Sequence, residues 1–96
     1  HLKISGALKV VPRELGQLAN LAELDLCNNK VVEIPKEVGQ LQKLEVLNLQ
    51  NNCLTNLPSE IKGLKNLDLL FLQNNPIAIA EQEKINNWLP HCSITY

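Results

Sequence analysis

Residues 44–66 read LEVLNLQNNCLTNLPSEIKGLKN, and the 23 residues before them follow the same pattern. The shared pattern is LxxLxLxxNxLxxLPxEIxxLxx, and its leucine positions recur through most of the chain. Asparagine recurs with the same spacing at Asn29, Asn52 and Asn75. Because about ten positions recur in phase, the sequence indicates a tandem repeat of one structural unit. A single amphipathic helix would instead show a spacing of about 3.6 residues and no asparagine column.

The first half of each repeat predicts a short β-strand. Alternation along the strand places Leu24 and Leu26 on an inner face and Asp25 on an outer face. Stacked turns then form a parallel sheet, and the chain leaves each strand near the asparagine. The backbone loses its sheet partners at that point, so a buried carboxamide is expected to bond the backbone of adjacent turns. We therefore predict a structural role for Asn29, Asn52 and Asn75.

The second half of each repeat predicts a short helix. Pro35 and Pro58 fit the first helical position, where proline loses no hydrogen bond. Glu37 and Glu60 follow two residues later, near the positive end of the helix dipole. We expect one or two helical turns on the outer side of each repeat.

The first turn departs from the pattern. Leu2 and Ile4 fit inward strand positions, but one residue is missing before Leu8, and Gly6 or Ala7 occupies the place of the asparagine. Terminal repeats of solenoids are expected to be atypical.

The C-terminal segment also departs from the pattern. Ile85, Trp88 and Leu89 fall on one face of a predicted helix between residues 80 and 89. We interpret this helix as a cap, with Trp88 covering the last leucine layer. Leu89, Cys92 and Ile94 then match LxxLxL, which predicts a final strand ending at Tyr96.

These observations predict one domain over residues 1–96. Its expected parts are a degenerate first repeat (1–20), three regular repeats (21–43, 44–66 and 67–78) and a C-terminal cap (79–96).

The repeat resembles that of leucine-rich-repeat proteins, over nearly the whole chain. The 23-residue form with LPxEI is similar to bacterial members, notably those of pathogenic leptospires, and the tail from Asn75-Pro76-Ile77 to Cys92-Ser93-Ile94 resembles their closing unit. The resemblance implies an α/β fold, a right-handed horseshoe with about five parallel strands on its concave face and short helices on its convex face. It also implies ligand binding on the concave face, most often of proteins, and makes contact with host proteins a plausible setting. A secreted or cell-surface location is expected, although the chain shows no signal-peptide pattern.

Composition argues against several other functions. Nine basic and ten acidic residues are well mixed, with a formal net charge of −1. No lysine or arginine cluster is dense enough to follow a phosphate backbone, so a nucleic-acid partner is not expected. No apolar run approaches the ~18–20 residues of a membrane span. No motif for hydrolysis, phosphoryl transfer or hydride transfer is present, so we expect no enzyme activity and no cofactor.

The cysteines Cys27, Cys53 and Cys92 do not suggest chemistry. Their number is odd, and none belongs to a CxxC pair, which makes zinc and redox sites weak interpretations. Cys27 and Cys53 occupy different positions of the repeat, which argues against a disulfide bond between them. Cys92 is expected to point inward in place of a leucine. A nucleophilic Cys27 would need a base, and no histidine is expected beside it.

Aligning the repeats predicts which side chains line the outer face of the sheet. Three columns are expected along the strands, and they end with His91, Ser93 and Thr95. A fourth column, at the strand exits, is expected to hold Asn28, Asn51 and Asn74. The first three columns are Glu23, Val46, Leu69, His91; Lys3, Asp25, Asn48, Phe71, Ser93; and Ser5, Cys27, Gln50, Gln73, Thr95.

An apolar patch stands out on this face. Val46, Leu69 and Phe71 should lie side by side, because neighbouring strands are about 4.8 Å apart. Apolar clusters with polar rims often mark interfaces, and Phe71 is a reasonable hot spot. The polar border is expected at Asp25, Asn48, Gln50, Gln73 and His91.

Two other interpretations remain open. The three apolar side chains could pack on each other and cover the sheet without a partner. Alternatively, the chain is a self-associating module that forms homo-oligomers through the open sheet edges at its two ends. Concentration-dependent assembly would favour the second interpretation over ligand binding.

Overall fold

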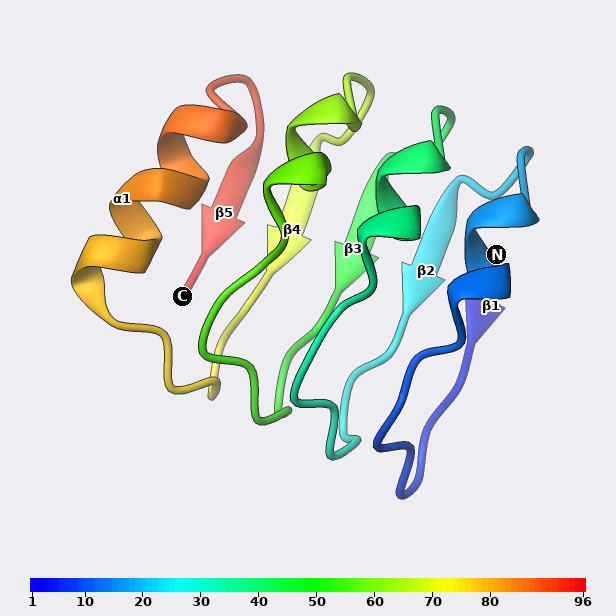
Figure 1. The fold of residues 1–96 in the computed structure, drawn as a ribbon, viewed down its shortest axis with the longest axis horizontal. Helices are drawn as coiled ribbons and strands as arrows, with labels where there is room; N and C mark the ends of the chain where they lie inside the picture. Colours follow the sequence, from blue (N-terminus) through cyan, green and yellow to red (C-terminus); the bar gives the residue numbers. More distant parts are fainter.

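The computed structural model describes all residues 1–96 as a stack of turns with two layers. In Figure 1 the strands form one layer and the helical segments the other. The strands pair in chain order as one five-stranded parallel sheet, β1-β2-β3-β4-β5. The strands are β1 (Leu2–Lys3), β2 (Glu23–Asp25), β3 (Val46–Asn48), β4 (Leu69–Phe71) and β5 (Ser93–Thr95). The helical layer comprises the 3-10 helices η1 (Arg13–Gln17), η2 (Lys36–Gln40) and η3 (Ser59–Gly63) and the α-helix α1 (Ile79–Trp88).

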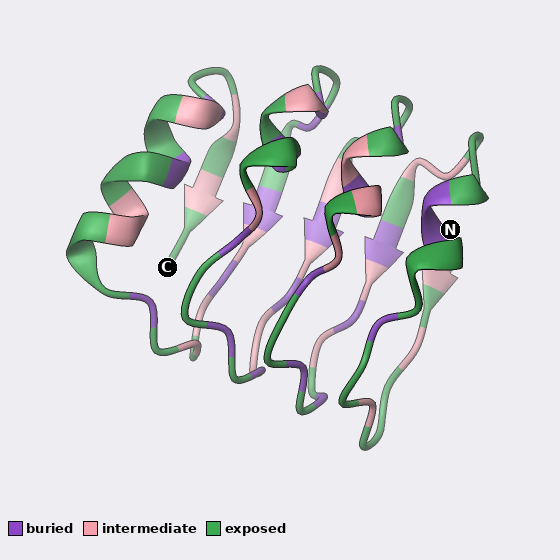
Figure 2. Cartoon of the chain, in the orientation of Figure 1, coloured by how far each residue is buried: buried purple, intermediate pink, exposed green.

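The predicted leucine-rich α/β solenoid is confirmed by this architecture. Alternation in the strands buries the central residues Leu24, Leu47 and Leu70, which pair with each other across β2, β3 and β4. The buried residues recur at equivalent places in successive turns (Figure 2). A single cluster of aliphatic side chains therefore runs through the molecule between the two layers. None of the helices is long and apolar enough to cross a membrane.

The inner asparagine column, Asn29, Asn52 and Asn75, links successive turns by hydrogen bonds, as predicted. The Asn52 side-chain amide donates to the carbonyl oxygens of Leu26 and Leu49, both within 3.0 Å, and its oxygen accepts from the Val31 N–H at 3.0 Å. Asn29 and Asn75 make the equivalent three bonds. Each carboxamide thus satisfies backbone groups of two turns at the point where the chain leaves the sheet.

The prolines sit one position earlier than predicted. Pro35 and Pro58 are N-cap residues with extended backbone (ψ 147° and 146°), not the first residues of the helices. The reason is the short 3-10 hydrogen bond: the Val38 N–H donates to the Pro35 carbonyl at 3.1 Å. The proline therefore accepts the first bond of the helix from outside it.

Glycine permits the helical layer to stack closely. A Cβ atom added to Gly39 would lie 2.5 Å from the carbonyl oxygen of Glu60, in the next turn. Gly16 has the same relationship, also at 2.5 Å, with the carbonyl oxygen of Glu37. Lys62 occupies this place in the third turn, where the next layer is α1 and no 3-10 helix follows. The switch from glycine to lysine therefore coincides with the end of the regular stack.

The helix α1 closes the C-terminal end of the core. Ile85 and Leu89 are buried, and Trp88 packs against the core cluster, as expected for a cap. The Tyr96 hydroxyl lies 2.8 Å from Asn86 Oδ1 and 3.1 Å from the Gln82 carbonyl oxygen. These contacts hold the end of the chain against the cap.

The predicted register of the last strand is wrong. Ser93, Ile94 and Thr95 pair with Leu69, Leu70 and Phe71, so Ile94 is the equivalent of Leu70 and not of Leu72. The Cys92 N–H donates to the Leu89 carbonyl oxygen at 3.1 Å, as the Leu67 N–H donates to Leu64 at 3.2 Å. Cys92 therefore takes the place of Leu67, facing the core, and the strand begins directly after it.

Candidate functional site

The outer face of the sheet brings the predicted apolar patch together. Val46 and Leu69 are direct neighbours in the register of β3 and β4. Phe71 lies two residues beyond Leu69 on the same strand and therefore on the same face. Leu69 is 39% exposed, whereas Leu70, which points inward between Leu69 and Phe71, is completely buried. We call Val46, Leu69 and Phe71 the apolar patch.

Polar residues border this patch on both sides. On one side, Glu23 of β2 pairs with Val46, and on the other side, Ser93 of β5 pairs with Leu69. In the next row of the face, Asp25 pairs with Asn48 and Asn48 pairs with Phe71. Asp25 and Asn48 are thus placed as the sequence predicts, next to the apolar patch.

Local hydrogen bonds hold these two polar side chains in place. Asp25 Oδ1 accepts from the Cys27 N–H, and Asn48 Oδ1 accepts from the Gln50 N–H, both at 3.0 Å. Burial raises the pKa of Asp25, but the hydrogen bonds from the Cys27 thiol and N–H and the charge of Lys3 outweigh it, so the net pKa lies below its usual value. The carboxylate therefore stays charged at neutral pH.

The same carboxylate keeps Cys27 protonated. The hydrogen bond to Asp25 raises the pKa of the thiol, and burial raises it further. His1 is engaged elsewhere, because its Nδ1 lies 2.9 Å from Glu23 Oε2. A thiol with a raised pKa beside a carboxylate is a poor nucleophile, so the arrangement does not favour covalent chemistry at Cys27.

Gln50 and Gln73 continue the face just beyond the strands. Their carbonyl oxygens accept from the N–H groups of Asn28 and Asn51, at 3.0 Å and 2.9 Å, so the backbone stays in register there. Both side chains are half-buried. The Gln73 Oε1 atom is buried and has no hydrogen-bond partner.

His91 does not belong to this face, contrary to the sequence prediction. It lies in the turn between α1 and β5 and is exposed there. The reason is the register of β5: the place beside Leu69 that was assigned to His91 is taken by Ser93. Thr95 likewise lies beside Phe71 rather than in the column of Gln73.

A ladder of asparagines at the surface, whose role the sequence analysis did not identify, runs along the strand exits; Asn28 and Asn74 are exposed and Asn51 is half-buried. Asn28, Asn51 and Asn74 adopt left-handed backbone conformations with φ of 60–61°. The Asn74 side-chain amide donates to Asn51 Oδ1, and the Asn51 amide donates to Asn28 Oδ1. The repeated Asn-Asn doublet in the sequence could have indicated this turn, because asparagine tolerates the left-handed region better than most residues.

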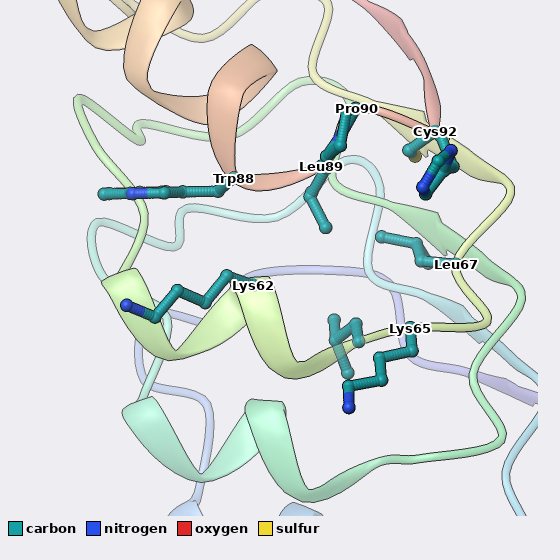
Figure 3. Close-up of a pocket in the computed structure, with 9 residues that line it drawn as sticks. Lys62, Lys65, Leu67, Trp88, Leu89, Pro90 and Cys92 are labelled. Carbon is teal, nitrogen blue, oxygen red and sulfur yellow. The ribbon is translucent and has the colours of Figure 1, made fainter.

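An opening between the repeats and the cap lies away from the sheet face. It is a cavity of about 320 Å³ between η3 and α1. Figure 3 shows Leu67 and Leu89 at its centre, with Lys62 and Lys65 on the η3 side and Trp88 on the α1 side. His91 and Cys92 also line it. The cavity lies where the α-helix of the cap takes the place of another tightly stacked 3-10 helix.

Metal-binding clusters are not formed by the folded chain. No group of three or more histidine, cysteine, aspartate or glutamate side chains converges. Cys27, Cys53 and Cys92 are free thiols.

Comparisons with known proteins agree with the fold. A family model described as leucine rich repeat matches residues 19–77. The chain is similar to a solved leucine-rich-repeat protein of Leptospira interrogans, with 50% identity and a TM-score of 0.93 over 94% of this chain and 23% of that one. An internalin of Listeria monocytogenes shares the fold alone, with 20% identity and a TM-score of 0.61 over 92% of this chain and 31% of that one. The chain thus spans less than a third of the length of either protein. No match was found among curated proteins.

Proposed function

The chain belongs to the leucine-rich-repeat family, whose fold typically serves as a protein-interaction module, and on this basis we propose that it binds a protein ligand through the apolar patch. The observation that carries the proposal is the adjacency of Val46, Leu69 and Phe71 on the outer sheet face. The fully buried centre of an interface is more apolar than its polar rim and is enriched in aromatic side chains, and a few such buried side chains provide most of the binding energy in many complexes.

The surface around the patch is preorganised for binding. Its strands are held by the parallel ladder, and the Asp25 and Asn48 side chains are fixed by hydrogen bonds to the backbone two residues later. A rigid surface loses little conformational entropy when a partner binds. The charged Asp25 beside the apolar patch favours a partner that presents an apolar side chain next to a basic or hydrogen-bond-donating group.

A host-facing setting is part of the proposal. It is supported by the similarity to the Leptospira interrogans protein and implies a secreted or cell-surface location. The module acts by binding and not by catalysis: the only thiol on the sheet face, Cys27, has a raised pKa, and His1 is paired with Glu23.

The test is a binding assay with the immobilised chain against an array of purified extracellular-matrix and host cell-surface proteins. Replacing Val46, Leu69 and Phe71 with alanine is expected to lower the affinity for any captured protein at least tenfold. The matched control replaces Val10, Val32 and Ile79 with alanine, because these are the most exposed apolar side chains away from the sheet face.

Circular dichroism must show that both triple variants remain folded. Equal binding by the folded patch variant and the wild-type chain would refute the assignment of the patch. If only the control variant loses binding, the ligand occupies the convex or terminal surfaces instead.

A further inference from the structure

The cavity between η3 and α1 has an apolar floor. Leu64, Leu67 and Leu89 line it, and the half-buried Trp88 adds part of its indole ring. We call this opening of about 320 Å³ the cap cavity. Its volume falls at the lower end of the range of about 300–1,000 Å³ that small-molecule sites occupy, and such sites are mostly apolar. The cap cavity therefore has the size and the floor of a site for a small ligand.

The titratable side chains around this floor are mostly basic. Lys62, Lys65 and His91 line the cap cavity, and no aspartate or glutamate does. Asp68, whose charge reaches Cys92, is exposed and lies outside the lining. Figure 3 shows Lys62 on the same side of the opening as Trp88, and Lys65 on the other side with Leu67. A cleft lined by charges of one sign attracts ligands of the opposite sign, so this one favours an anion.

The two lysines have no partner within the chain. Only the ammonium groups of Lys43 and Lys84 donate hydrogen bonds to other side chains, and the pair of Lys84 with Glu81 is the one ion pair that a lysine forms. The charges of Lys62 and Lys65 are therefore not neutralised by a neighbouring carboxylate. Their flexible four-carbon stems let the ammonium groups turn toward a bound anion, and no existing ion pair has to break.

The repeat carries these two lysines only beside the cap. Lys62 stands where the two earlier turns have the glycines that allow close stacking, and Lys65 stands where they have Ala19 and Gln42. The helix η3 also packs less closely against α1 than against η2. The turn that has an opening beside it is thus the turn in which both positions become cationic.

We propose that the cap cavity binds a small amphipathic anion, with an aromatic body against Leu67, Leu89 and Trp88 and a carboxylate or sulfonate group at the ammonium groups of Lys62 and Lys65. Hydrogen bonds between charged partners are stronger than neutral ones, so the anionic group fixes the orientation of the ligand. The cap cavity lies away from the sheet face, and the proposal does not rest on the proposed binding of a protein.

The probe that tests the proposal is 8-anilinonaphthalene-1-sulfonate, which joins aromatic rings to one sulfonate group. Trp88 is the only tryptophan, so the decrease of its emission measures binding. We expect one site with a Kd of roughly tens of micromolar, as for other ligands of about 20 non-hydrogen atoms. N-phenyl-1-naphthylamine lacks the sulfonate and should bind more weakly. The proposal is wrong if the sulfonate probe does not bind, or binds no more tightly than this neutral analogue.

Charge-removing variants test the role of the lysines. Lys62→Gln combined with Lys65→Gln should raise the Kd of the sulfonate probe about five- to tenfold, the effect expected of two solvated ion pairs, and leave that of the neutral analogue unchanged. The matched control, Lys30→Gln with Lys36→Gln, removes the same charge from exposed lysines outside the cap cavity and should bind both probes like the wild-type chain. An unchanged Kd of the sulfonate probe in the first variant, or an equal loss for both probes, would contradict the proposal.

The three free thiols locate the bound probe. Cys92 lines the cap cavity, Cys27 lies on the sheet face, and Cys53 lies outside both. A saturating concentration of the sulfonate probe should slow the alkylation of Cys92 by iodoacetamide several-fold at pH 9, while the rates at Cys27 and Cys53 stay unchanged. Protection of Cys27 instead of Cys92 would place the probe on the sheet face and overturn the assignment of the cavity.

Discussion

The side-chain amide of Asn51 donates a hydrogen bond to Oδ1 of Asn28, one turn earlier in the chain, over 2.6 Å. Both residues have a left-handed backbone, with φ of 60° and 61°. The residue that allows the chain to turn out of the strand therefore also links that turn to its neighbour. Directly beside it, Asn52 links the same turns through buried backbone groups. Two asparagine columns, one exposed and one buried, thus fix the spacing of the stack.

Backbone conformation should dominate at Asn51. Asn51→Ala is expected to lower the free energy of unfolding by about 1 kcal/mol more than Asn51→Gly, because alanine is strained in the left-handed region and glycine is not. Urea denaturation measures the difference. Equal losses for the two variants would show that the side-chain ladder, and not the backbone conformation, is what matters at this position.

The buried column should be far more sensitive. Asn52→Ala leaves the Val31 N–H without its partner. It also removes one of the two asparagine donors to each of the Leu26 and Leu49 carbonyl oxygens, to which Asn29 and Asn75 still donate. The expected loss is about 2–4 kcal/mol, from one unsatisfied buried N–H at about 1–3 kcal/mol and two lost hydrogen bonds at about 0.5–1.5 kcal/mol each, and it is a large fraction of the stability of a small domain. Asn56→Ala is the control at an exposed position and should change the urea midpoint little. A loss at Asn52 no larger than at Asn56 would contradict the assigned role.

Close stacking of the helical layer makes one glycine indispensable and another replaceable. Gly39→Ala would bring a methyl group to 2.5 Å from the Glu60 carbonyl oxygen, whereas at Gly63 the nearest atom is 3.4 Å away. We expect Gly39→Ala to lower the melting temperature, with a cost of about 1–3 kcal/mol from overpacking. Gly63→Ala should be neutral or slightly stabilising, because alanine restricts the unfolded chain more than glycine does. Differential scanning calorimetry of both variants checks the pair.

The three thiols should differ in reactivity. Burial, with a smaller contribution from Asp68, raises the pKa of Cys92 to about 11, and the hydrogen bond to Asp25 raises that of Cys27. At pH 8 iodoacetamide should therefore modify the exposed Cys53 first. The alkylation rate of Cys92 should rise about tenfold per pH unit up to about pH 10, because the thiolate is the nucleophile. Mass spectrometry of timed digests gives the three rates.

The variant Asp25→Asn tests whether the carboxylate of Asp25 or burial raises the pKa of Cys27. Without the carboxylate charge the pKa of this thiol should fall and its alkylation should accelerate, while the rate at Cys92 stays unchanged. An unchanged rate at Cys27 would mean that burial alone controls this thiol.

Much of the fold and of the candidate surface follows from the repeat alone. A constant step of 23 residues makes each turn the neighbour of the next in register, and alternation along each strand decides which side chains face outward. Val46, Leu69, Phe71, Asp25 and Asn48 could therefore be placed side by side from the sequence. The role of the buried asparagines followed from the same regularity, because a repeated polar residue inside a leucine core requires repeated backbone partners.

The tertiary structure decided what lies at the two ends, where the step is not constant. The cap places β5 two residues further along than the LxxLxL match predicts, because Leu89 and Cys92 take the backbone bonds and core places of Leu64 and Leu67. His91 consequently lies in a turn, and Ser93 takes its expected place beside Leu69. At the other end, only packing reveals that Leu18 is uncovered while Leu41 is buried. Identical spacing sets the neighbours of an inner turn, but the first and last turns described here depart from that spacing, so their register and exposure depend on three-dimensional packing.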